Sequence, residues 1–309
     1  MDLSVIIPNW NGATVLPDCV GEVLADLEAS GLSYEVIVVD DASSDGSAQA
    51  VGRRFPRVTV VLNPQNNGFA FTVNAGIRRS SGDYVLLLNN DAKPQPGAMR
   101  RVWTYLRENR DVGAAGCRII DANGVLQRSC RDFPSLTNLV FRRALEAVPL
   151  RTRGSAQFGT EFWPHDSVRR VDWIHMVFLM ISRDALRTIG NLDERFFMYG
   201  EDTDFGWRLK RAGLGLVFLP DVHVLHIAGF SGNKRWGRQA LRKRQLGIHL
   251  VLGKYHSSFY VLAYRVLMIL LQAARLAWLP IQAAMGYPSE MLDAEREIAA
   301  VVLQANLRP

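Results

Sequence analysis

The chain has little cysteine. Cys19, Cys117 and Cys130 are the only three among 309 residues, and no C-x-x-C pair occurs. An odd set of widely spaced cysteines is not a disulfide framework, so we expect free thiols in a reducing cytoplasm. The chain enters an apolar run directly after Met1 and Asp2. From this start we expect no signal peptide.

Several nucleotide-binding motifs are also missing. No G-x-G-x-x-G follows the first apolar run, which disfavours a dinucleotide-binding fold, and no G-x-x-x-x-G-K-[ST] is present, which argues against a P-loop nucleotidase. The net charge of +6 suits a polyanionic ligand or an anionic membrane surface. Charge alone would permit nucleic acid, but no zinc-finger spacing or nucleic-acid motif occurs, so we expect no such partner.

The chain lacks an uninterrupted hydrophobic run long enough to span a membrane. Phe259–Leu279 is strongly apolar, but it carries Arg265 and Arg275 with only nine residues between them. A spanning helix needs about 20 mostly apolar residues, so spanning is not expected. Arg265, Gln272 and Arg275 share one narrow helical stripe, which suits an interfacial helix or a buried subunit contact. The basic run Lys234–Arg244 just before it is either a solvated face or a site for lipid phosphates.

Two prolines punctuate this C-terminal region. Pro280 is predicted to end the apolar helix, because proline removes a backbone donor and clashes with the preceding turn. Pro288–Asn306 is then predicted to form a second, amphipathic helix.

What the chain does have is a regular alternation of apolar strand-like runs with stretches of helical periodicity. The strand-like runs are Leu3–Ile7, Tyr34–Asp40, Val58–Leu62, Tyr84–Leu88, Val112–Ile120 and Met176–Ile181. This order predicts an α/β fold with a mostly parallel central sheet flanked by helices, followed by a C-terminal helical extension. Residues 128–168 are predicted to be irregular.

Polar residues stand at the carboxyl ends of two of these runs. Tyr84–Leu88 has the character of a strand buried on both faces, and Asn89-Asn90-Asp91 follows it. Ligands of open α/β sheets bind beyond the carboxyl ends of the strands. Asp91 is a hard oxygen ligand suited to Mg²⁺ or Mn²⁺. Asp40 ends the second strand in the same way. Both positions are equally compatible with turns or helix caps.

Three carboxylates open a later helix. At 3.6 residues per turn, Asp202 projects in the same direction as Leu209, toward the interior, whereas Asp204 points away and can pair with Arg208. A carboxylate aimed inward from a helix N-terminus is a candidate catalytic group. The alternative is that Glu201, Asp202 and Asp204 merely stabilise the helix dipole.

Seven blocks in order along the chain resemble the inverting family 2 glycosyltransferases of GT-A fold, most of all the bacterial branch that includes rhamnosyltransferases. The blocks are SVIIPNWNG, YEVIVVDDASSDGS, NPQNNGFAFTVNAGI, GDYVLLLNNDAKP, VDW, DERFFMYGEDTDFGWRLKRAGLGLVFLP and the segment from His226 to Ser231. They cover residues 3 to about 231. The resemblance implies a GT-A catalytic domain at 1–230, with a nucleotide-binding half at 1–118 and an acceptor half at 119–230. Residues 231–309 would form a helical region that binds membrane or another subunit.

The resemblance also implies roles for individual residues. Asp202 would be the base that deprotonates the acceptor hydroxyl, with Glu201 as the next candidate. Asp91 would hold a Mg²⁺ or Mn²⁺ ion on the donor diphosphate, and His226 would reach the metal or the diphosphate. The nucleotide would be bound by Pro8, Asn9, Asn11, Asp40, Gly68, Asn74 and Asn90.

The sequence departs from the family pattern in places. Asn89 and Asn90 replace the commoner acid or proline before the metal-binding Asp91. His175-Met176-Val177 stands where the family usually has small residues, which implies an unusually shaped acceptor pocket.

The expected activity is transfer of a sugar with inversion. The donor would be a nucleoside-diphosphate sugar and the acceptor a polyprenyl-linked or polysaccharide glycan at the inner face of the plasma membrane. Two other functions are weaker. A sugar nucleotidyltransferase would need an N-terminal Gly-rich loop with Arg and Lys, which is missing. A non-catalytic sugar-nucleotide-binding protein would not need both Asp91 and Asp202. A homodimer is the alternative to membrane binding for the C-terminal helices.

Overall fold

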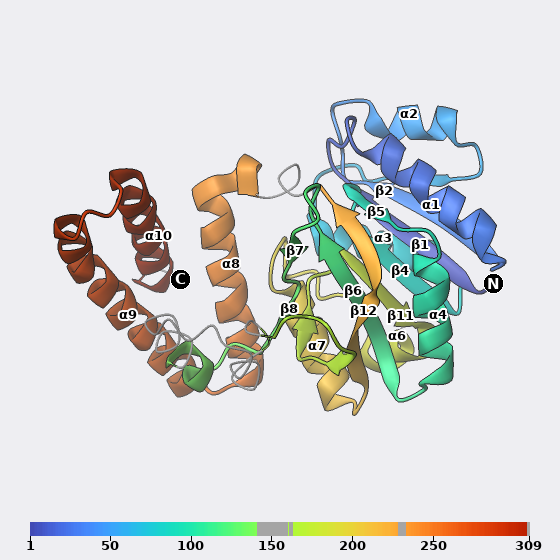
Figure 1. The fold of residues 1–309 in the computed structure, drawn as a ribbon. Coiled ribbons are helices and arrows are strands. Elements are labelled where there is room, and N and C mark those ends of the chain that lie inside the picture. The colour runs from blue at the N-terminus through green and yellow to red at the C-terminus, as the bar shows by residue number, and fades with distance from the viewer. Residues whose placement is uncertain (141–159, 161–162, 228–232, 308–309) are drawn as a thin grey trace. The chain divides into compact units, whose positions relative to one another are not determined.

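The computed structural model describes residues 1–140, 160, 163–227 and 233–307 (Figure 1). Two compact units make up the chain. Unit 1 comprises Met1–Phe133, Leu150–Phe197 and Glu201–Ala228, and unit 2 comprises Pro134–Pro149, Met198–Gly200 and Gly229–Pro309. Unit 1 contains the sheet and unit 2 the C-terminal helices.

Unit 1 is built on a 10-stranded sheet whose main order is β3-β2-β1-β4-β11-β6-β12-β5. The strands of this sheet are β1 (Leu3–Asn9), β2 (Tyr34–Asp40), β3 (Thr59–Leu62), β4 (Tyr84–Leu88), β5 (Ala92–Pro94), β6 (Val112–Ile120), β7 (Leu126–Gln127), β9 (Arg169–Arg170), β11 (Phe178–Ser182) and β12 (Gly215–His226). A separate two-stranded sheet pairs β8 (Cys130–Arg131) with β10 (Trp173–Ile174). The helices of the described residues include α1 (Leu16–Ser30), α2 (Ser47–Arg54), α3 (Phe69–Arg79), α4 (Ala98–Glu108), α6 (Arg183–Ile189), α7 (Glu201–Arg211), α8 (Asn233–Tyr255), α9 (Ser258–Ala284) and α10 (Ser289–Leu307).

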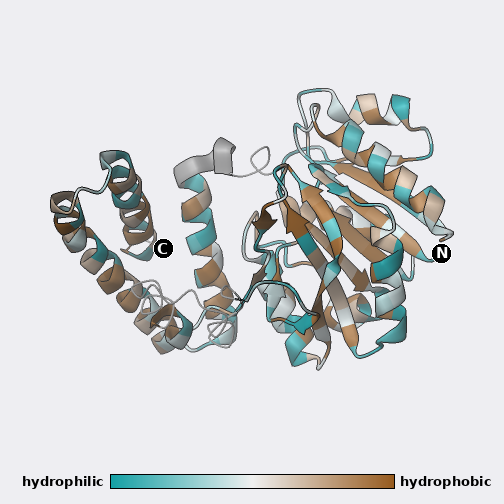
Figure 2. Ribbon diagram, viewed as in Figure 1, coloured by the Kyte–Doolittle hydropathy of each residue, from teal (hydrophilic) through white to brown (hydrophobic). Residues whose placement is uncertain are grey.

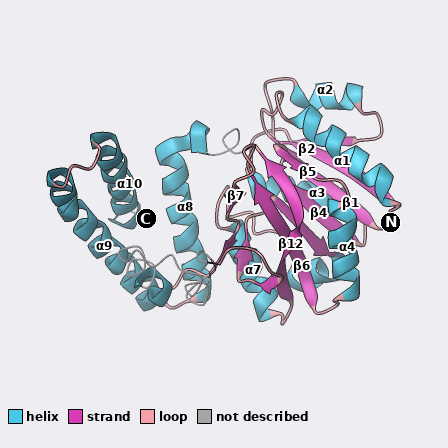
Figure 3. Ribbon diagram, in the orientation of Figure 1, coloured by secondary structure: helices cyan, strands magenta, loops and turns pink. Residues whose placement is uncertain are grey.

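The predicted parallel pairing is found in the first four strands, β3-β2-β1-β4, and again between β6 and β12. Other pairings make the sheet mixed: β11 runs antiparallel between β4 and β6, and β5 pairs antiparallel with the end of β12. Figure 3 shows the strands in magenta and the helices that cover them in cyan. The antiparallel orientation puts the start of β11 beside the carboxyl end of β4.

Helices cover both faces of the sheet, as the continuous apolar runs predicted. All five residues of β4 are buried. Leu86 and Leu88 belong to one apolar cluster with residues of α1 and α4, while Val85 and Leu87 belong to a second cluster with residues of α3, α6 and α7. Because successive side chains of a strand point to opposite faces, each face of β4 is buried under its own layer of helices.

Two strands lie outside the predicted strand-like runs, and one local prediction is wrong. Ala92–Pro94 forms the edge strand β5. Gly215–His226 forms one strand, β12, with a register shift between Leu219 and His223. Pro280 does not end the apolar helix, because α9 continues through it to Ala284.

The helix tolerates Pro280 because its neighbours hold it in place. The residue is itself exposed, while Leu279 beside it is buried. α9 also packs along α10 in the turns before the proline, through Arg265 and Arg275. Tertiary packing therefore outweighs the cost of one lost backbone hydrogen bond.

The three cysteines are free and buried, as expected from their spacing. Burial raises the pKa of the Cys19 and Cys117 thiols far above their ordinary value, and it raises the pKa of Cys130 to about 12. A thiol reacts with disulfide reagents as the thiolate, so these side chains are inert in the folded protein.

We predict that the folded protein does not react with a dithiobis-nitrobenzoate reagent at pH 8, whereas the chain unfolded in guanidinium releases three equivalents of chromophore. Absorbance after mixing measures both reactions. Fast release of even one equivalent from the folded protein would contradict the burial of that thiol.

Candidate active site

The carboxyl ends of β1 and β2 hold Asp40 in a dense set of hydrogen bonds. Asn9 and Asp40 are direct partners in the parallel register, and the Asn9 amide Nδ2 donates to Asp40 Oδ1 over 2.7 Å. Ser43 donates its backbone N–H to Asp40 Oδ2 over 2.9 Å and its hydroxyl to Oδ1 over 2.6 Å. Asp40 is 4% exposed. The donors leave one acceptor position on Oδ2 for a further group.

A second contact ties this cluster to the loop after β4. Asn90 donates its amide Nδ2 to Asn9 Oδ1 over 2.8 Å. The chain at Gly12 crosses directly over this pair. A Cβ there would lie 2.3 Å from Asn9 Oδ1 and 2.5 Å from Asn90 Nδ2. Only glycine lets the loop pass so close.

Asn11 and Asp45 fix the two loops at this edge. Asn11 has a φ of 51°, its backbone N–H donates to Ser43 Oγ, and its Oδ1 accepts from the Ser44 amide. Burial by itself raises the pKa of Asp45, but hydrogen bonds from Ser47 and the Ala13 amide lower it below the ordinary value. Pro8, just before Asn9, lies within β1 and is partly exposed.

Gly68 is the N-cap residue of α3, and its backbone lies in close contact with the backbone at Phe197. Its φ is +88°, and a Cβ would lie 2.2 Å from the Phe197 carbonyl oxygen. The Gly68 amide donates to Asp41 Oδ2 over 2.9 Å, and Phe69 N–H donates to the same Phe197 carbonyl. Both the left-handed conformation and the contact require glycine.

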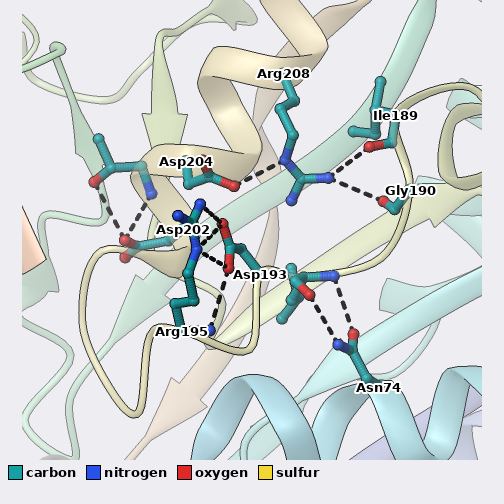
Figure 4. Close-up of polar contacts among 10 residues, drawn as sticks. Asn74, Ile189, Gly190, Asp193, Arg195, Asp202, Asp204 and Arg208 are labelled. Atoms are coloured by element: carbon teal, nitrogen blue, oxygen red, sulfur yellow. Dashed lines mark hydrogen bonds and ion pairs between the residues drawn. The ribbon is translucent and has the colours of Figure 1, made fainter. Parts of the chain in front are cut away.

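Asn74 is engaged away from the Asn9–Asp40 cluster. Its amide Nδ2 donates to the Leu192 carbonyl over 2.8 Å, and its Oδ1 accepts from Leu192 N–H (Figure 4). The same Nδ2 also donates to Glu194 Oε1 over 2.9 Å. Asn74 therefore fastens the loop before α7 to α3. Its predicted role in nucleotide binding stays a prediction.

Asp91 and His226 face each other at the edge formed by β5 and β12. Asp91 Oδ1 lies 3.2 Å from His226 Nε2, and the Asp91 side chain is fully buried. The pairing of Ala92 with His226 across the two strands creates this proximity, and the Asp91 carbonyl also accepts from Ile227 N–H.

Gln127 sets the orientation of the His226 ring. Its amide Nε2 donates to the His226 carbonyl over 3.0 Å, which leaves Oε1 as an acceptor 2.7 Å from the ring Nδ1. Nδ1 consequently carries a proton, and Nε2 is the nitrogen directed at Asp91. In a neutral ring the Nε2 lone pair then faces a carboxylate oxygen. Such a pair is stable with either a proton or a cation between the two atoms.

Asp202 lies in the first turn of α7 and contacts His175. His175 Nδ1 lies 3.2 Å from Asp202 Oδ2, and Thr203 N–H donates to Asp202 Oδ1 over 2.7 Å. Asp202 and Glu201 are both buried, at 8% and 7% exposure. The predicted inward direction of Asp202, shared with Leu209, is found.

The prediction for Asp204 is right about its partner and wrong about its direction. Asp204 pairs with Arg208 over 2.8 Å, as predicted, but it is fully buried and does not point away from the interior (Figure 4). Arg208 explains the burial, because it also donates to the carbonyls of Ile189 and Gly190. The pair closes the gap between α7 and the end of α6.

The structure brings most of the predicted site residues to one edge of the sheet. Hydrogen bonds join Asn9 to Asp40 and to Asn90, and Asp91 follows Asn90 directly. Asp202 is connected to the same loop indirectly. Its carboxylate contacts the His175 side chain, the His175 carbonyl accepts from Val177 N–H, and the Val177 carbonyl accepts from Asn89 N–H. No group of three or more His, Cys, Asp and Glu side chains that could hold a metal occurs among the described residues.

Known proteins resemble this chain in sequence and in fold. The family model described as glycosyl transferase family 2 matches residues 4–159. The N-acetylglucosaminyl-diphospho-decaprenol L-rhamnosyltransferase of Mycobacterium tuberculosis is 31% identical over 249 residues, which cover 73% of this chain and 76% of that protein. This chain belongs to glycosyl transferase family 2.

Other relatives agree with this family 2 assignment. The rhamnosyltransferase WbbL of Escherichia coli K12 is 26% identical, over 71% of this chain and 84% of that protein. Among solved structures, the mannosyltransferase PcManGT from Pyrobaculum calidifontis, in complex with GDP-Man and Mn²⁺, has a TM-score of 0.59. It is 17% identical and covers 99% of this chain and 86% of that one. The fold is thus the GT-A type expected from the sequence blocks.

Two contact residues of this family 2 glycosyltransferase were not among the residues predicted from the sequence. Gln127 lies in a two-residue strand, β7, that carries no pattern of its own. His175 was noticeable only as a departure from the small residues usual in the family. Nothing in the sequence indicated that it contacts Asp202.

Proposed function

We propose that this protein is an inverting glycosyltransferase. It moves a sugar from a nucleoside-diphosphate sugar to a hydroxyl group of a polyprenyl-linked or polysaccharide acceptor, in the synthesis of a cell-surface glycan. The observation that carries the proposal is the Asp91–His226 pair, which faces the same strand-end edge as Asn9 and Asp40. Residues 1–118 are the nucleotide-binding half and residues 119–230 the acceptor half.

The Asp91–His226 pair fits a divalent cation. One carboxylate oxygen and one imidazole nitrogen lie 3.2 Å apart. Mg²⁺ is typically bound by one or two protein groups, with substrate phosphates and water completing its coordination. A pair, rather than a cluster of three, is therefore sufficient for Mg²⁺ or Mn²⁺ on a donor diphosphate. Such an ion would neutralise charge on the departing diphosphate.

The nucleotide is assigned to the edge formed by β1 and β2. The open acceptor position on Asp40 Oδ2 suits an N–H group of a base, while Pro8, Asn9 and Asn11 border it. Gly68, Asn74 and Asn90 complete the proposed nucleotide-binding residues. Gly68 and Asn90 hold the loops of this edge together, because Gly68 N–H donates to Asp41 and Asn90 donates to Asn9. Asn74 acts by holding the loop at Leu192.

Asp202 is proposed as the base. Thr203 N–H occupies its Oδ1, so Oδ2 is the atom that accepts the proton of the acceptor hydroxyl. Removing this proton as the oxygen attacks the anomeric carbon, opposite the leaving diphosphate, gives a single displacement with inversion. Glu201 is the alternative base.

Two observations support the proposal of a lipid-linked acceptor: the name of a relative and the composition of α9. The Mycobacterium tuberculosis relative is named for a decaprenol-linked acceptor. By length and composition alone, α9 is the one helix of the described residues that could cross a membrane. It is brown along much of its length in Figure 2.

The polar residues of α9 face α10. Arg265 donates to the Asn306 carbonyl over 2.9 Å, Arg275 pairs with Glu295 over 3.1 Å, and Gln272 is buried. The opposite stripe of α9 is exposed and apolar. It comprises Phe259, Leu262, Val266, Leu270 and Trp278, which are 81%, 56%, 46%, 60% and 52% exposed.

This orientation differs from that of a soluble helical hairpin, which turns its charged residues to water. Both arginines of α9 face α10 and one apolar stripe faces outward, while Tyr264 and Met268 pack in a buried apolar cluster. The arrangement suits a helix lying in the interface of a bilayer, at the cytoplasmic face of the plasma membrane. The basic residues of α8, such as Arg242 and Arg244, would add attraction to anionic lipid, about 1 kcal/mol for each one near the surface.

Asp91→Ala is predicted to weaken the metal-dependent binding of the donor by more than about tenfold, because Asn89 and Asn90 are neutral and bind a dication poorly. Calorimetric titration of UDP-, GDP- and dTDP-linked sugars, with Mn²⁺ and with a chelator, measures the effect. Asp184→Ala, at a side chain 80% exposed on α6, is the matched control. Equal binding by wild type with and without Mn²⁺ would contradict the metal assignment.

Asp202→Asn is predicted to lower kcat by roughly 10²–10⁴-fold with little change in donor affinity, because the base acts on the acceptor. Transfer is measured with the donor found in the titrations and a polyprenyl-diphosphate-linked N-acetylglucosamine. Glu201→Gln is tested beside it. Normal turnover by Asp202→Asn together with loss in Glu201→Gln would move the base to Glu201.

The protein is predicted to float with vesicles of phosphatidylglycerol and phosphatidylethanolamine, more strongly at higher phosphatidylglycerol content and less at high salt. Changing Phe259 and Leu270 to Ser together should abolish flotation. Leu62→Ser, at a residue 59% exposed on β3, should not. If the protein ignores every vesicle and light scattering gives a stable dimer, the apolar stripe is a subunit interface.

A further inference from the structure

We propose that His175 is a positioning residue for the reaction: it holds the carboxylate of Asp202 in the orientation that accepts the acceptor's proton. This inference rests on the proposed function, in which Asp202 is the base. It assigns a role to a residue that stands where the family usually has small side chains.

The contact itself defines which atom donates. An ionised carboxylate only accepts hydrogen bonds, so the His175 Nδ1 facing Asp202 Oδ2 at 3.2 Å carries the proton. Thr203 occupies the other oxygen, with its N–H at 2.7 Å and its hydroxyl at 3.3 Å. With one donor on each oxygen, the carboxylate cannot rotate about its bond to Cβ without losing a hydrogen bond. One lone pair of Oδ2 remains for a substrate proton.

The backbone of His175 is fixed from two sides. Its N–H donates to the Ser129 carbonyl over 3.0 Å, and its own carbonyl accepts from Val177 N–H over 2.8 Å. The residue occupies the short connection between β10 and β11, both of which are hydrogen-bonded to other strands. The position of the His175 Cα is therefore fixed by hydrogen bonds and by the strands around it.

The ring is oriented by a fixed aromatic neighbour. The rings of His175 and Trp173 meet edge to face, with centroids 5.0 Å apart and planes at 86°. Trp173 is itself held by a hydrogen bond from its Nε1 to the Asp132 carbonyl over 2.9 Å. The imidazole thus has one well-packed face and a defined rotamer.

The separation between Asp202 and His175 is set by a close approach of α7 to this connection. A Cβ on Gly206 would lie 2.3 Å from the Asp172 carbonyl oxygen and 2.8 Å from Trp173 Cβ. The helix backbone therefore packs directly on the residues before His175. A larger residue at 206 would push the first turn of α7, and Asp202 with it, away from the ring.

Exposure distinguishes the two partners. The His175 side chain is 35% exposed, and that of Asp202 is 11% exposed. The imidazole is thus the more accessible of the two groups, and it holds Oδ2 of a carboxylate that keeps some exposure to a substrate. A misplacement of about 1 Å in a reacting group can cost on the order of 10²-fold in rate, which is the scale on which a positioning contact matters.

The test replaces the ring in two ways. His175→Leu removes the donor, and we expect kcat to fall about 10–100-fold while KM for the nucleotide sugar changes less than about twofold. His175→Asn keeps an N–H donor at the same distance along the side chain, and we expect it to recover most of the lost kcat. His223→Leu, which removes an imidazole from β12, is the matched control. Thermal unfolding of each variant checks that the fold is intact.

Two results would overturn the proposal. If His175→Asn is as inactive as His175→Leu, with both folded, the imidazole has its own chemical role and is not a positioning group. If His175→Leu lowers the residual activity of Asp202→Asn by the same factor as in wild type, the two residues act independently. Non-additive loss in the double variant supports the proposal. Full activity of Asp202→Asn would instead refute Asp202 as base, and with it the proposed function.

Discussion

The antiparallel pairing of β5 with the end of β12 is the contact on which the candidate site depends. It places Ala92 opposite His226 and so brings Asp91 against an imidazole from the far end of the catalytic unit. Gln127, from β7, then fixes the ring so that Nε2 faces the carboxylate. Three segments distant in the sequence meet at one buried polar pair. Burying a carboxylate is costly unless a proton donor or a cation faces it, and the pairing of the strands provides the imidazole nitrogen that can hold either one beside Asp91.

The second antiparallel strand, β11, determines where the residues of the proposed acceptor half lie. β11 lies between β4 and β6 and begins where β4 ends, with Phe178 opposite Leu88. The residues that precede it, His175 among them, therefore lie at the same edge as Asn89 and Asp91. Had β11 been parallel to β4, its preceding residues would lie at the opposite edge of the sheet. α7 packs on this connection at Gly206, which carries Asp202 to the edge where the other polar groups gather.

The helical unit leaves an apolar stripe of α9 exposed. In unit 1 apolar side chains fill two clusters on the faces of one sheet. In unit 2 a smaller apolar cluster includes Tyr264 and Met268 of α9, the guanidinium groups of Arg265 and Arg275 are bound by α10, and a second apolar stripe of α9 is left outside. Exposed apolar surface of that length is unfavourable in water, so it calls for a bilayer or a second chain to cover it.

The sequence alone determined the class of fold, the buried strands, the free thiols and the strand ends at which polar residues gather. These depend on local periodicity and on the residue that follows each apolar run. Helical spacing also gave the inward direction of Asp202 and the Asp204–Arg208 pair. The tertiary structure decided what depends on partners: the burial of Asp204 under Arg208, the attachment of Asn74 to Leu192, the survival of α9 through Pro280, and the contacts of Asp91 with His226 and of Asp202 with His175. The physical reason is that periodicity fixes which side of an element a residue occupies, whereas the order and direction of strands in the sheet decide which distant residue it meets.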